Sequence, residues 1–194
     1  KWWGVKFRQN NLASLTLAKL CLHLMKKIPV GVIGVGHLGY RHAQNYAELL
    51  QALLVGICDL DSTKLKEASS RLNTPGFTQY QGLFGKVKAV SIAVPTNLHY
   101  KIAKDCLNQG IDVLIEKPIS SNLAQARALI KLAQENGLIL QVGHIERFNS
   151  AFLAIERIAK QPLFIECHRL SPFPGRSLDI GVVQDLMIHD IDII

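Results

Sequence analysis

Two periodicities of hydrophobic and polar residues alternate along the chain from residue 30 onward. Short apolar runs occur at Val30–Val35, Leu53–Cys58, Ala89–Val94, Val113–Ile115 and Leu138–Val142. Runs of this length, without an alternating polar face, are typical of strands in a parallel sheet that helices cover on both sides. The pattern therefore predicts an α/β fold with a doubly wound parallel sheet.

The segments between these runs have the spacing of amphipathic helices. Ser62 can cap the second of them, and Gly110 and Gly137 stand where a left-handed residue ends a helix. Residues 73–76 read as a turn. We expect helices over Leu38–Leu50, Ser62–Leu72, Leu98–Asn108 and Leu123–Asn136.

The pattern changes after Gly143. We expect a helix over Phe148–Lys160, a strand over Leu163–Leu170, a proline-rich loop over Ser171–Gly175 and a helix over Val182–Ile194. One strand and two helices bury too little apolar surface to stand alone. We therefore interpret 146–194 as the truncated beginning of an α+β substrate domain, after a dinucleotide-binding domain over 25–145.

Residues 1–24 form a basic extension. Met25 resembles a natural start, so we expect the extension to be unnecessary for function, with a surface helix or a targeting segment as alternatives. The chain has 22 basic and 15 acidic residues, and six of the basic ones lie within residues 1–27, where there is no acid. The rest is nearly neutral, so we expect no nucleic-acid partner.

Composition narrows the class further. The 48% hydrophobic and 19% charged residues are those of a globular protein, and no apolar run is long enough to suggest a membrane partner. The cysteines are dispersed, and we place Cys58 and Cys167 in strands. Dispersed cysteines favour reduced thiols in a cytoplasmic protein; they are Cys21, Cys58, Cys106 and Cys167.

A glycine-rich motif follows the first predicted strand. Gly34-Val35-Gly36-His37-Leu38-Gly39 opens a predicted helix, and Asp59 ends the second strand about twenty residues later. In this context Gly34 permits the tight turn, Gly36 admits a pyrophosphate and Gly39 lets helix and strand pack closely. The motif therefore predicts a Rossmann dinucleotide site, in which His37 and Leu38 line the phosphate loop.

Asp59 indicates which dinucleotide binds. Its carboxylate can accept hydrogen bonds from the adenosine ribose hydroxyls and would repel a 2′-phosphate, which favours NAD over NADP. Ser62 and Lys64 lie nearby and could partly offset that repulsion.

Further polar residues follow the third predicted strand, at the sheet edge where ligands of such folds bind. Pro95, Thr96, Asn97 and His99 could line the nicotinamide side of the cofactor. Alternatively, Thr96 or Asn97 merely caps the next helix.

Several motifs together resemble the Gfo/Idh/MocA oxidoreductases. They are Val32–Gly39, Cys58-Asp59, Ile92–His99, Glu116-Lys117-Pro118 and Asp185-Leu186-Met187-Ile188-His189. The resemblance implies hydride transfer between a sugar or polyol carbon and nicotinamide. It assigns catalysis to Lys117, Asp185 and His189, adds Glu116 and Lys117 to the cofactor site, and implies that full-length members form homo-oligomers.

The residue types agree with these roles. Asp185 and His189 share a helix face, His189 can take the alcohol proton, and Lys117 can stabilise a developing negative charge. Asp185 can orient His189 or bind a neighbouring hydroxyl, and the Lys117–Pro118 bond can be cis. A metal site at His189, Asp190 and Asp192 lacks further well-spaced ligands, so we expect none.

Two segments, Gly143–Asn149 and His168–Pro172, look most like members that oxidise the 3-hydroxyl of UDP-N-acetylglucosamine-type nucleotide sugars. Substrate contacts are expected from Arg147, Asn149, Arg169 and Arg176, although each arginine could equally form a surface salt bridge. Two alternatives to an active dehydrogenase stay open: an inactive NAD-binding fragment and an NAD-dependent glycosidase.

Overall fold

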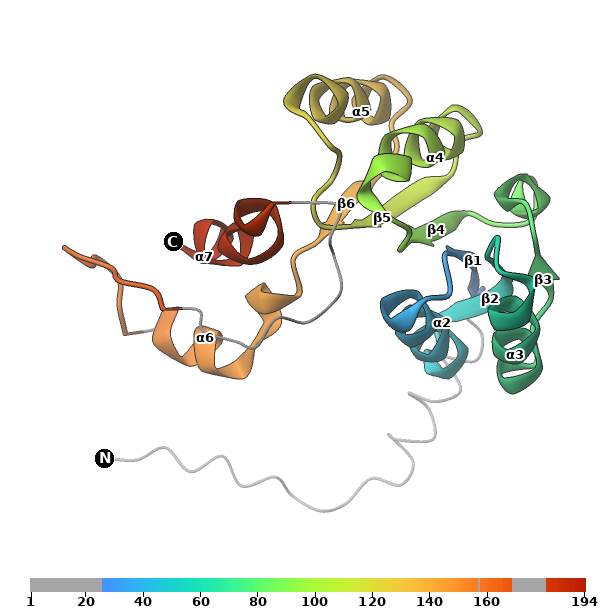
Figure 1. Ribbon diagram of the computed structural model, residues 1–194, viewed down its shortest axis with the longest axis horizontal. Helices are drawn as coiled ribbons and strands as arrows, with labels where there is room; N and C mark the ends of the chain where they lie inside the picture. Colours follow the sequence, from blue (N-terminus) through green and yellow to red (C-terminus); the bar gives the residue numbers. More distant parts are fainter. Residues whose placement is uncertain (1–25, 157, 169–180) are drawn as a thin grey trace, which may run out of the picture.

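The computed structural model describes residues 26–156, 158–168 and 181–194, and its centre is a parallel sheet (Figure 1). The strand order is β3-β2-β1-β4-β5-β6, and every pairing is parallel. This arrangement confirms the predicted doubly wound fold. The strands are β1 (Ile28–Ile33), β2 (Ala52–Cys58), β3 (Gly76–Phe77), β4 (Ala89–Ile92), β5 (Asp112–Glu116) and β6 (Leu140–Gly143).

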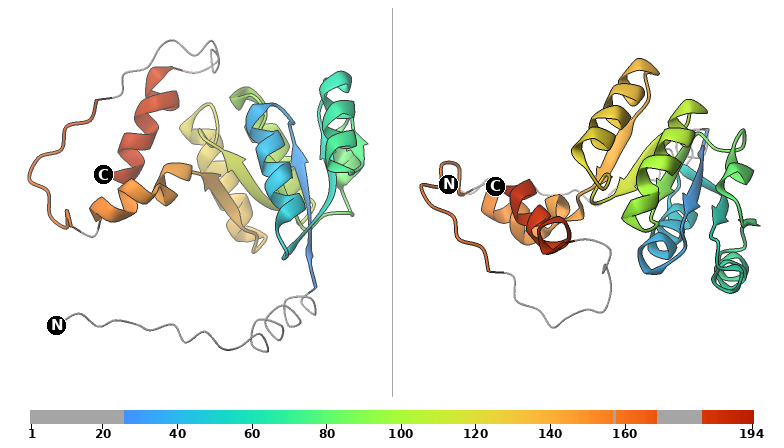
Figure 2. Two further views of the ribbon diagram at one scale, coloured as in Figure 1. Left: turned by 90° about the horizontal axis from the view of Figure 1, so that it is seen from below. Right: turned by 45° about the horizontal axis from the view of Figure 1, so that its top comes forward.

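Helices cover both faces of the sheet (Figures 1 and 2). The helices α2 (His37–Glu48) and α3 (Ser62–Leu72) pack on one face, and α4 (Thr96–Asn108) and α5 (Leu123–Glu135) pack on the other. A 3₁₀ turn, η1 (Tyr80–Leu83), lies between β3 and β4. All four helices were predicted, with ends within two residues of those observed, as is usual for helix boundaries.

Each face of the sheet has its own apolar core. Val32 and Ile57 are fully buried under α2 and α3. Ile92, Leu107 and Ile115 are fully buried in the larger core on the α4 and α5 side. The strands bury side chains on both faces, which explains why their sequences lack a polar alternation.

Two details differ from the prediction. Asp61, not Ser62, caps α3, because its Oδ1 accepts hydrogen bonds from the amides of Thr63 and Lys64 at 3.0 and 3.1 Å. The strand β3 was not predicted, since its two residues are too short to show a periodicity. It pairs with Ile57–Cys58 at the edge of the sheet.

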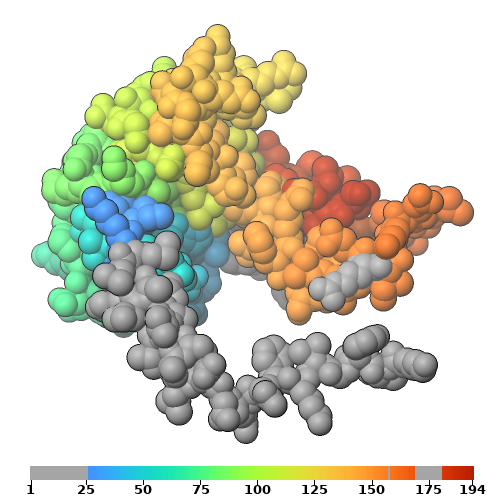
Figure 3. All heavy atoms as spheres, turned by 180° about the vertical axis from the view of Figure 1, so that it is seen from behind, coloured from blue at the N-terminus to red at the C-terminus, as the bar shows by residue number. Residues whose placement is uncertain are grey.

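The chain after β6 stands to one side of the sheet, as Figure 3 shows in orange and red. It forms a 3₁₀ turn η2 (Ile145–Phe148), α6 (Ser150–Glu156), a π-helical segment η3 (Val183–Met187) and α7 (Ile188–Ile193). The prediction of a helix over Val182–Ile194 is confirmed. The helix predicted over Phe148–Lys160 is shorter than expected. It begins at Ser150, directly after its cap Asn149, and residues 158–160 are not helical.

The strand predicted over Leu163–Leu170 is wrong for its described part. Residues 163–168 pair with no other strand among the described residues, and Leu163 and Phe164 are exposed. An apolar run becomes a strand only where a neighbouring strand can take its backbone hydrogen bonds. Cys167 is therefore not in a strand, whereas Cys58 is. Residues 169–170 and the loop predicted over Ser171–Gly175 lie outside the described residues.

Candidate functional site

The glycine loop joins β1 to α2 and has the geometry that a phosphate group needs. Gly34 has φ +88° and passes close to the Ala93 carbonyl. A Cβ on Gly39 would overlap the carbonyl oxygen of Gly34, whereas one on Gly36 would meet nothing within 4 Å. Gly34 and Gly39 are thus required by packing, and Gly36 leaves open space at the N-terminus of α2. A pyrophosphate fits there, facing unpaired amides and the positive end of the helix dipole.

Asp59 is bonded to this loop. Its Oδ2 accepts the amide of Val35 at 2.7 Å, and its Oδ1 accepts the amide of Asp61 at 2.9 Å. A carboxylate has about four acceptor positions, so two hydrogen bonds leave capacity for the ribose hydroxyls. The carboxylate therefore fixes the loop against the end of β2 while it faces the hollow.

A hollow of about 460 Å³ opens at the carboxyl ends of β1, β2 and β4. Four residues predicted to bind the cofactor line it: Gly34, Gly36, Asp59 and Pro95. Another part of its wall comes from the loops after β2 and β3, from η1 and from α4, and among these residues only Leu98 belongs to a predicted motif. They are Leu60, Thr78, Gln79, Tyr80, Leu98 and Lys101.

Tyr80 is anchored within that wall. Its hydroxyl donates to Oδ2 of Asp105 at 2.6 Å. Burial, together with this hydrogen bond, raises the pKa of Tyr80 to about 12. This hydrogen bond fixes the ring in the lining of the hollow, where it adds an apolar surface.

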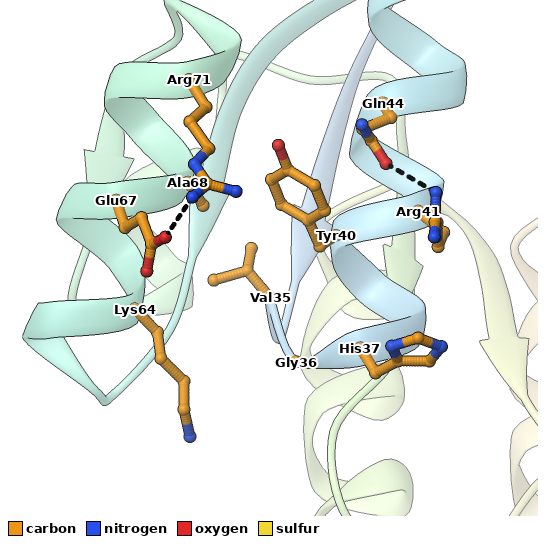
Figure 4. Close-up of a pocket in the computed structure, with 10 residues that line it drawn as sticks. All are labelled: Val35, Gly36, His37, Tyr40, Arg41, Gln44, Lys64, Glu67, Ala68 and Arg71. Carbon is orange, nitrogen blue, oxygen red and sulfur yellow. Dashed lines mark hydrogen bonds and ion pairs between the residues drawn. The ribbon is translucent and has the colours of Figure 1, made fainter.

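A second hollow, of about 360 Å³, lies between α2 and α3 (Figure 4). It adjoins the first, because Gly36 and Lys64 line both. Arg71 pairs with Glu67 at 2.7 Å on α3. Glu67 thus partly neutralises the basic side chains that line this hollow, which are Arg41, Lys64 and Arg71.

The residues at the start of α4 occupy different environments. Thr96 is buried and Asn97 is exposed, and both lie within the first turn of α4, whose N-cap position is Pro95. His99 is 1% exposed, with Nδ1 2.8 Å from the Pro118 carbonyl and Nε2 2.9 Å from the Val94 carbonyl. The expectation that its side chain lines the cofactor site is therefore corrected: His99 holds two loops together from behind that site.

The carboxyl end of β5 carries Glu116 and Lys117, followed by a cis peptide bond to Pro118. Nζ of Lys117 donates to Oδ1 of Asp185 at 2.8 Å and to the Asp185 carbonyl at 2.7 Å. Oε1 of Glu116 lies 2.9 Å from Nε2 of His42 on α2. Sequence reasoning missed His42, and the only signal for it was a polar side chain next to the buried Ala43.

The π-helical segment and α7 bring the predicted catalytic residues to this edge of the sheet. Asp185 bonds to Lys117, so in this structure it orients the lysine. His189 follows four residues later on the same helical stretch and is half-buried. Lys117 and Asp185, far apart in sequence, are therefore joined at the carboxyl end of β5.

The predicted substrate residues have protein partners. Nε and Nη2 of Arg147 donate to Oδ2 and Oδ1 of Asp192, each at 2.8 Å. Asn149 caps α6 by accepting the amide of Ala151 at 3.0 Å. The salt-bridge alternative thus describes Arg147 here, and Asn149 is a helix cap. Arg169 and Arg176 lie outside the described residues.

Asp192 sits at the centre of a small charged cluster. The hydrogen bonds from Arg147 lower the pKa of Asp192 below its ordinary value, and His144 and His189 add to this effect. Nδ1 of His144 lies 3.4 Å from Oδ2 of Asp192, a charge contact without hydrogen-bond geometry. This cluster attaches α7 to the end of β6.

The described ranges contain neither a metal centre nor a membrane-spanning helix. No group of three or more His, Cys, Asp or Glu side chains there is placed to hold a metal ion. No helix in the same ranges is long and apolar enough to cross a bilayer.

Comparison with known proteins agrees with this geometry. The family model for an oxidoreductase family with an NAD-binding Rossmann fold, GFO_IDH_MocA, matches residues 28–144. UDP-N-acetylglucosamine 3-dehydrogenase from Acidithiobacillus ferrooxidans is 43% identical over 164 residues, which cover 84% of this chain and 52% of that protein. Inositol 2-dehydrogenase from Rubrobacter xylanophilus is 30% identical, over 86% of this chain and 51% of that protein.

Solved structures show the same relation. A structure of the Acidithiobacillus ferrooxidans enzyme superposes with a TM-score of 0.80 at 41% identity, covering 87% of this chain and 55% of its own. Scyllo-inositol dehydrogenase from Lactobacillus casei, with NAD(H) and scyllo-inositol bound, gives 0.66 at 25% identity, covering 70% and 41%. The chain thus spans about half the length of the curated relatives it matches. Since the family model matches more than half of its residues, the chain belongs to the Gfo/Idh/MocA oxidoreductase family and has that family's NAD-binding Rossmann fold.

Proposed function

We propose that the whole protein is an NAD-dependent dehydrogenase that oxidises the 3-hydroxyl of a nucleotide sugar of the UDP-N-acetylglucosamine type. The observation that carries the proposal is the bond between Lys117 and Asp185, which brings two of the three expected catalytic residues together at the carboxyl edge of the sheet. The 43% identity to a UDP-N-acetylglucosamine 3-dehydrogenase supports the nucleotide sugar over an inositol.

Each residue of the expected site has a separate role. The bound NAD supplies a nicotinamide ring that accepts the hydride. Lys117, oriented by Asp185, donates a hydrogen bond to the substrate oxygen, and His189 accepts the hydroxyl proton as the C–H electron pair leaves. Asp59 would hold the adenosine ribose of NAD, and the amides after Gly36 would hold its pyrophosphate.

Two measurements test this proposal. Calorimetry of the purified chain with NAD should give saturable binding, and Asp59→Ala should weaken it. Sugar oxidation by the whole protein, measured by NADH absorbance, should proceed faster with UDP-N-acetylglucosamine than with myo-inositol. Saturable NAD binding with a preference for myo-inositol would contradict the substrate class alone, whereas an absence of NAD binding would overturn the function as a whole.

A further inference from the structure

A charged contact crosses from the phosphate-binding helix to the strand that ends in Lys117. Nε2 of His42, on α2, lies 2.9 Å from Oε1 of Glu116, on β5. The two side chains are only 17% and 10% exposed. Because α2 begins at the glycine loop and Glu116 directly precedes Lys117, this contact links the expected cofactor site to the expected catalytic lysine.

The carboxylate of Glu116 is held from a second side. Glu116 is paired with Gly143 in the β5–β6 register. A Cβ on Gly143 would lie 3.2 Å from Oε1 and 3.3 Å from Oε2 of Glu116, which is tighter than an ordinary contact. The carboxylate therefore packs against the backbone of Gly143, which has no side chain, while His42 contacts Oε1. That one contact leaves most of the acceptor positions of the carboxylate unused.

The strand order says which half of NAD lies near this pair. Asp59 follows β2, on one side of the glycine loop, and Glu116 ends β5, on the other side. In a dinucleotide fold the adenosine extends over the β2 side and the nicotinamide riboside over the β4–β5 side. Glu116 and His42 thus belong to the nicotinamide half.

We propose that His42 is a positioning residue, which holds Glu116 so that its carboxylate accepts a hydrogen bond from the nicotinamide riboside. This inference rests on the proposed function, because it requires NAD in the site. Without His42, a largely buried carboxylate loses its donor, and it turns away or takes up a proton. The nicotinamide half then loses its acceptor, while the adenosine half keeps the Asp59 contact.

The test compares two ligands that differ in the nicotinamide half. NAD reaches Glu116, whereas ADP contains only the adenosine and pyrophosphate. In calorimetry on the purified chain, His42→Ala should raise the Kd for NAD by about tenfold or more, as expected for the loss of a hydrogen bond to a charged group, and change the Kd for ADP by less than about twofold. His42→Gln, whose amide can donate to Oε1, should restore most of the NAD affinity.

A second variant keeps the test valid if His42→Ala does not fold, which circular dichroism would reveal. Glu116→Gln should weaken NAD and not ADP, and its effect should not add to that of His42→Ala. Equal weakening of both ligands, unchanged NAD affinity in every His42 variant, or additive effects would each overturn the positioning role. Failure of the unmodified chain to bind either ligand would instead overturn the proposed function, and this inference with it.

Discussion

The amide of Val35 donates to Oδ2 of Asp59 across 2.7 Å, so one carboxylate both ties down the phosphate loop and faces the cofactor hollow. A substitution at Asp59 therefore removes a loop contact together with the expected ribose contact. These two effects can be largely separated, because asparagine keeps one acceptor oxygen for the Val35 amide, while it loses the charge and replaces the oxygen that accepts from Asp61 with an NH2 group.

Asp59→Asn should hold the loop and relax the choice between dinucleotides. We expect its NAD affinity to fall by about tenfold and its preference for NAD over NADP to shrink, since the repulsion of a 2′-phosphate is gone. Asp59→Ala should lose NAD affinity further, without gaining NADP. Calorimetry with both dinucleotides checks this, and an Asp59→Asn chain that kept the full preference would contradict the electrostatic explanation.

Two glycines of the loop should respond differently to the same change. Gly39→Ala places a Cβ on the Gly34 carbonyl oxygen, so the loop must move, and we expect a loss of stability of about 2 kcal/mol or more. Gly36→Ala meets open space and should fold normally, but its methyl group would occupy the expected phosphate position. Thermal unfolding and NAD titration of both variants make the comparison. A Gly36→Ala chain that binds NAD normally would show that the phosphate lies elsewhere.

The ion pair between Lys117 and Asp185 should both hold residues 183–193 against the sheet and support catalysis. Lys117→Met removes the donor from a site where the side chains are 14% and 20% exposed. We expect faster amide exchange over residues 183–193 in this chain, and a fall in sugar oxidation by the whole protein of at least about 100-fold.

An exposed lysine gives the matched control for this experiment. Lys131 pairs with Glu135 on the surface of α5, with side chains 76% and 59% exposed. Lys131→Met should leave exchange and turnover nearly unchanged, because exposed pairs contribute little. Equal behaviour of the two variants would show that the Lys117–Asp185 pair contributes no more than an exposed pair.

The strands and the dinucleotide motif were predictable because both are local patterns. Short runs apolar on both faces indicated the buried parallel strands, and the glycine spacing indicated the loop. Sequence alone could not reveal that His42 contacts Glu116, because α2 and β5 meet only when the sheet is assembled. It also could not decide between Asp61 and Ser62 as the cap of α3, since both are good caps and only the backbone path selects one.

The region after β6 was the least predictable. The apolar run over 163–168 resembles a strand, but a run of apolar residues does not say whether a partner strand is present. Arg147 illustrates the same limit for a site residue. Its guanidinium could bind a diphosphate or a carboxylate equally well, and the structure pairs it with Asp192.

The contact that holds α7 against the end of β6 should weaken at low pH, because it depends on the ionised carboxylate of Asp192. Its pKa is lower in the folded chain than its ordinary value of 3.8, chiefly because Arg147 donates to it. The ionised carboxylate thus stabilises the contact above pH 3.8, and this stabilisation is lost as the pH falls through the lower folded value. The charged groups near Asp192 are Arg147, His144 and His189.

Amide exchange of residues 183–193, measured at falling pH and corrected for intrinsic rates, checks this expectation. Protection should decrease in acid in the unmodified chain, whereas Asp192→Asn should show weaker protection that no longer depends on this titration. Acid dependence that persists in Asp192→Asn would assign the effect to another carboxylate.

Burial should decide which thiols react. It raises the pKa of Cys58 and of Cys106 to about 12, while Cys167 is exposed. Since the thiolate is the reactive form, iodoacetamide at about pH 8 should modify Cys167 and spare the two buried thiols until the chain is unfolded. Peptide mass spectrometry reads the result, and rapid labelling of Cys106 in the folded chain would show that its core opens.

The absence of a side chain at Gly143 should restrict which residues homologues carry at this position and at Glu116. A side chain at position 143 would displace the Glu116 carboxylate. Substitutions at the two positions should therefore be correlated among homologues. Sequences that acquire a larger residue at the end of β6 should carry a shorter or uncharged residue in place of Glu116, and they should then tolerate the loss of the imidazole on α2.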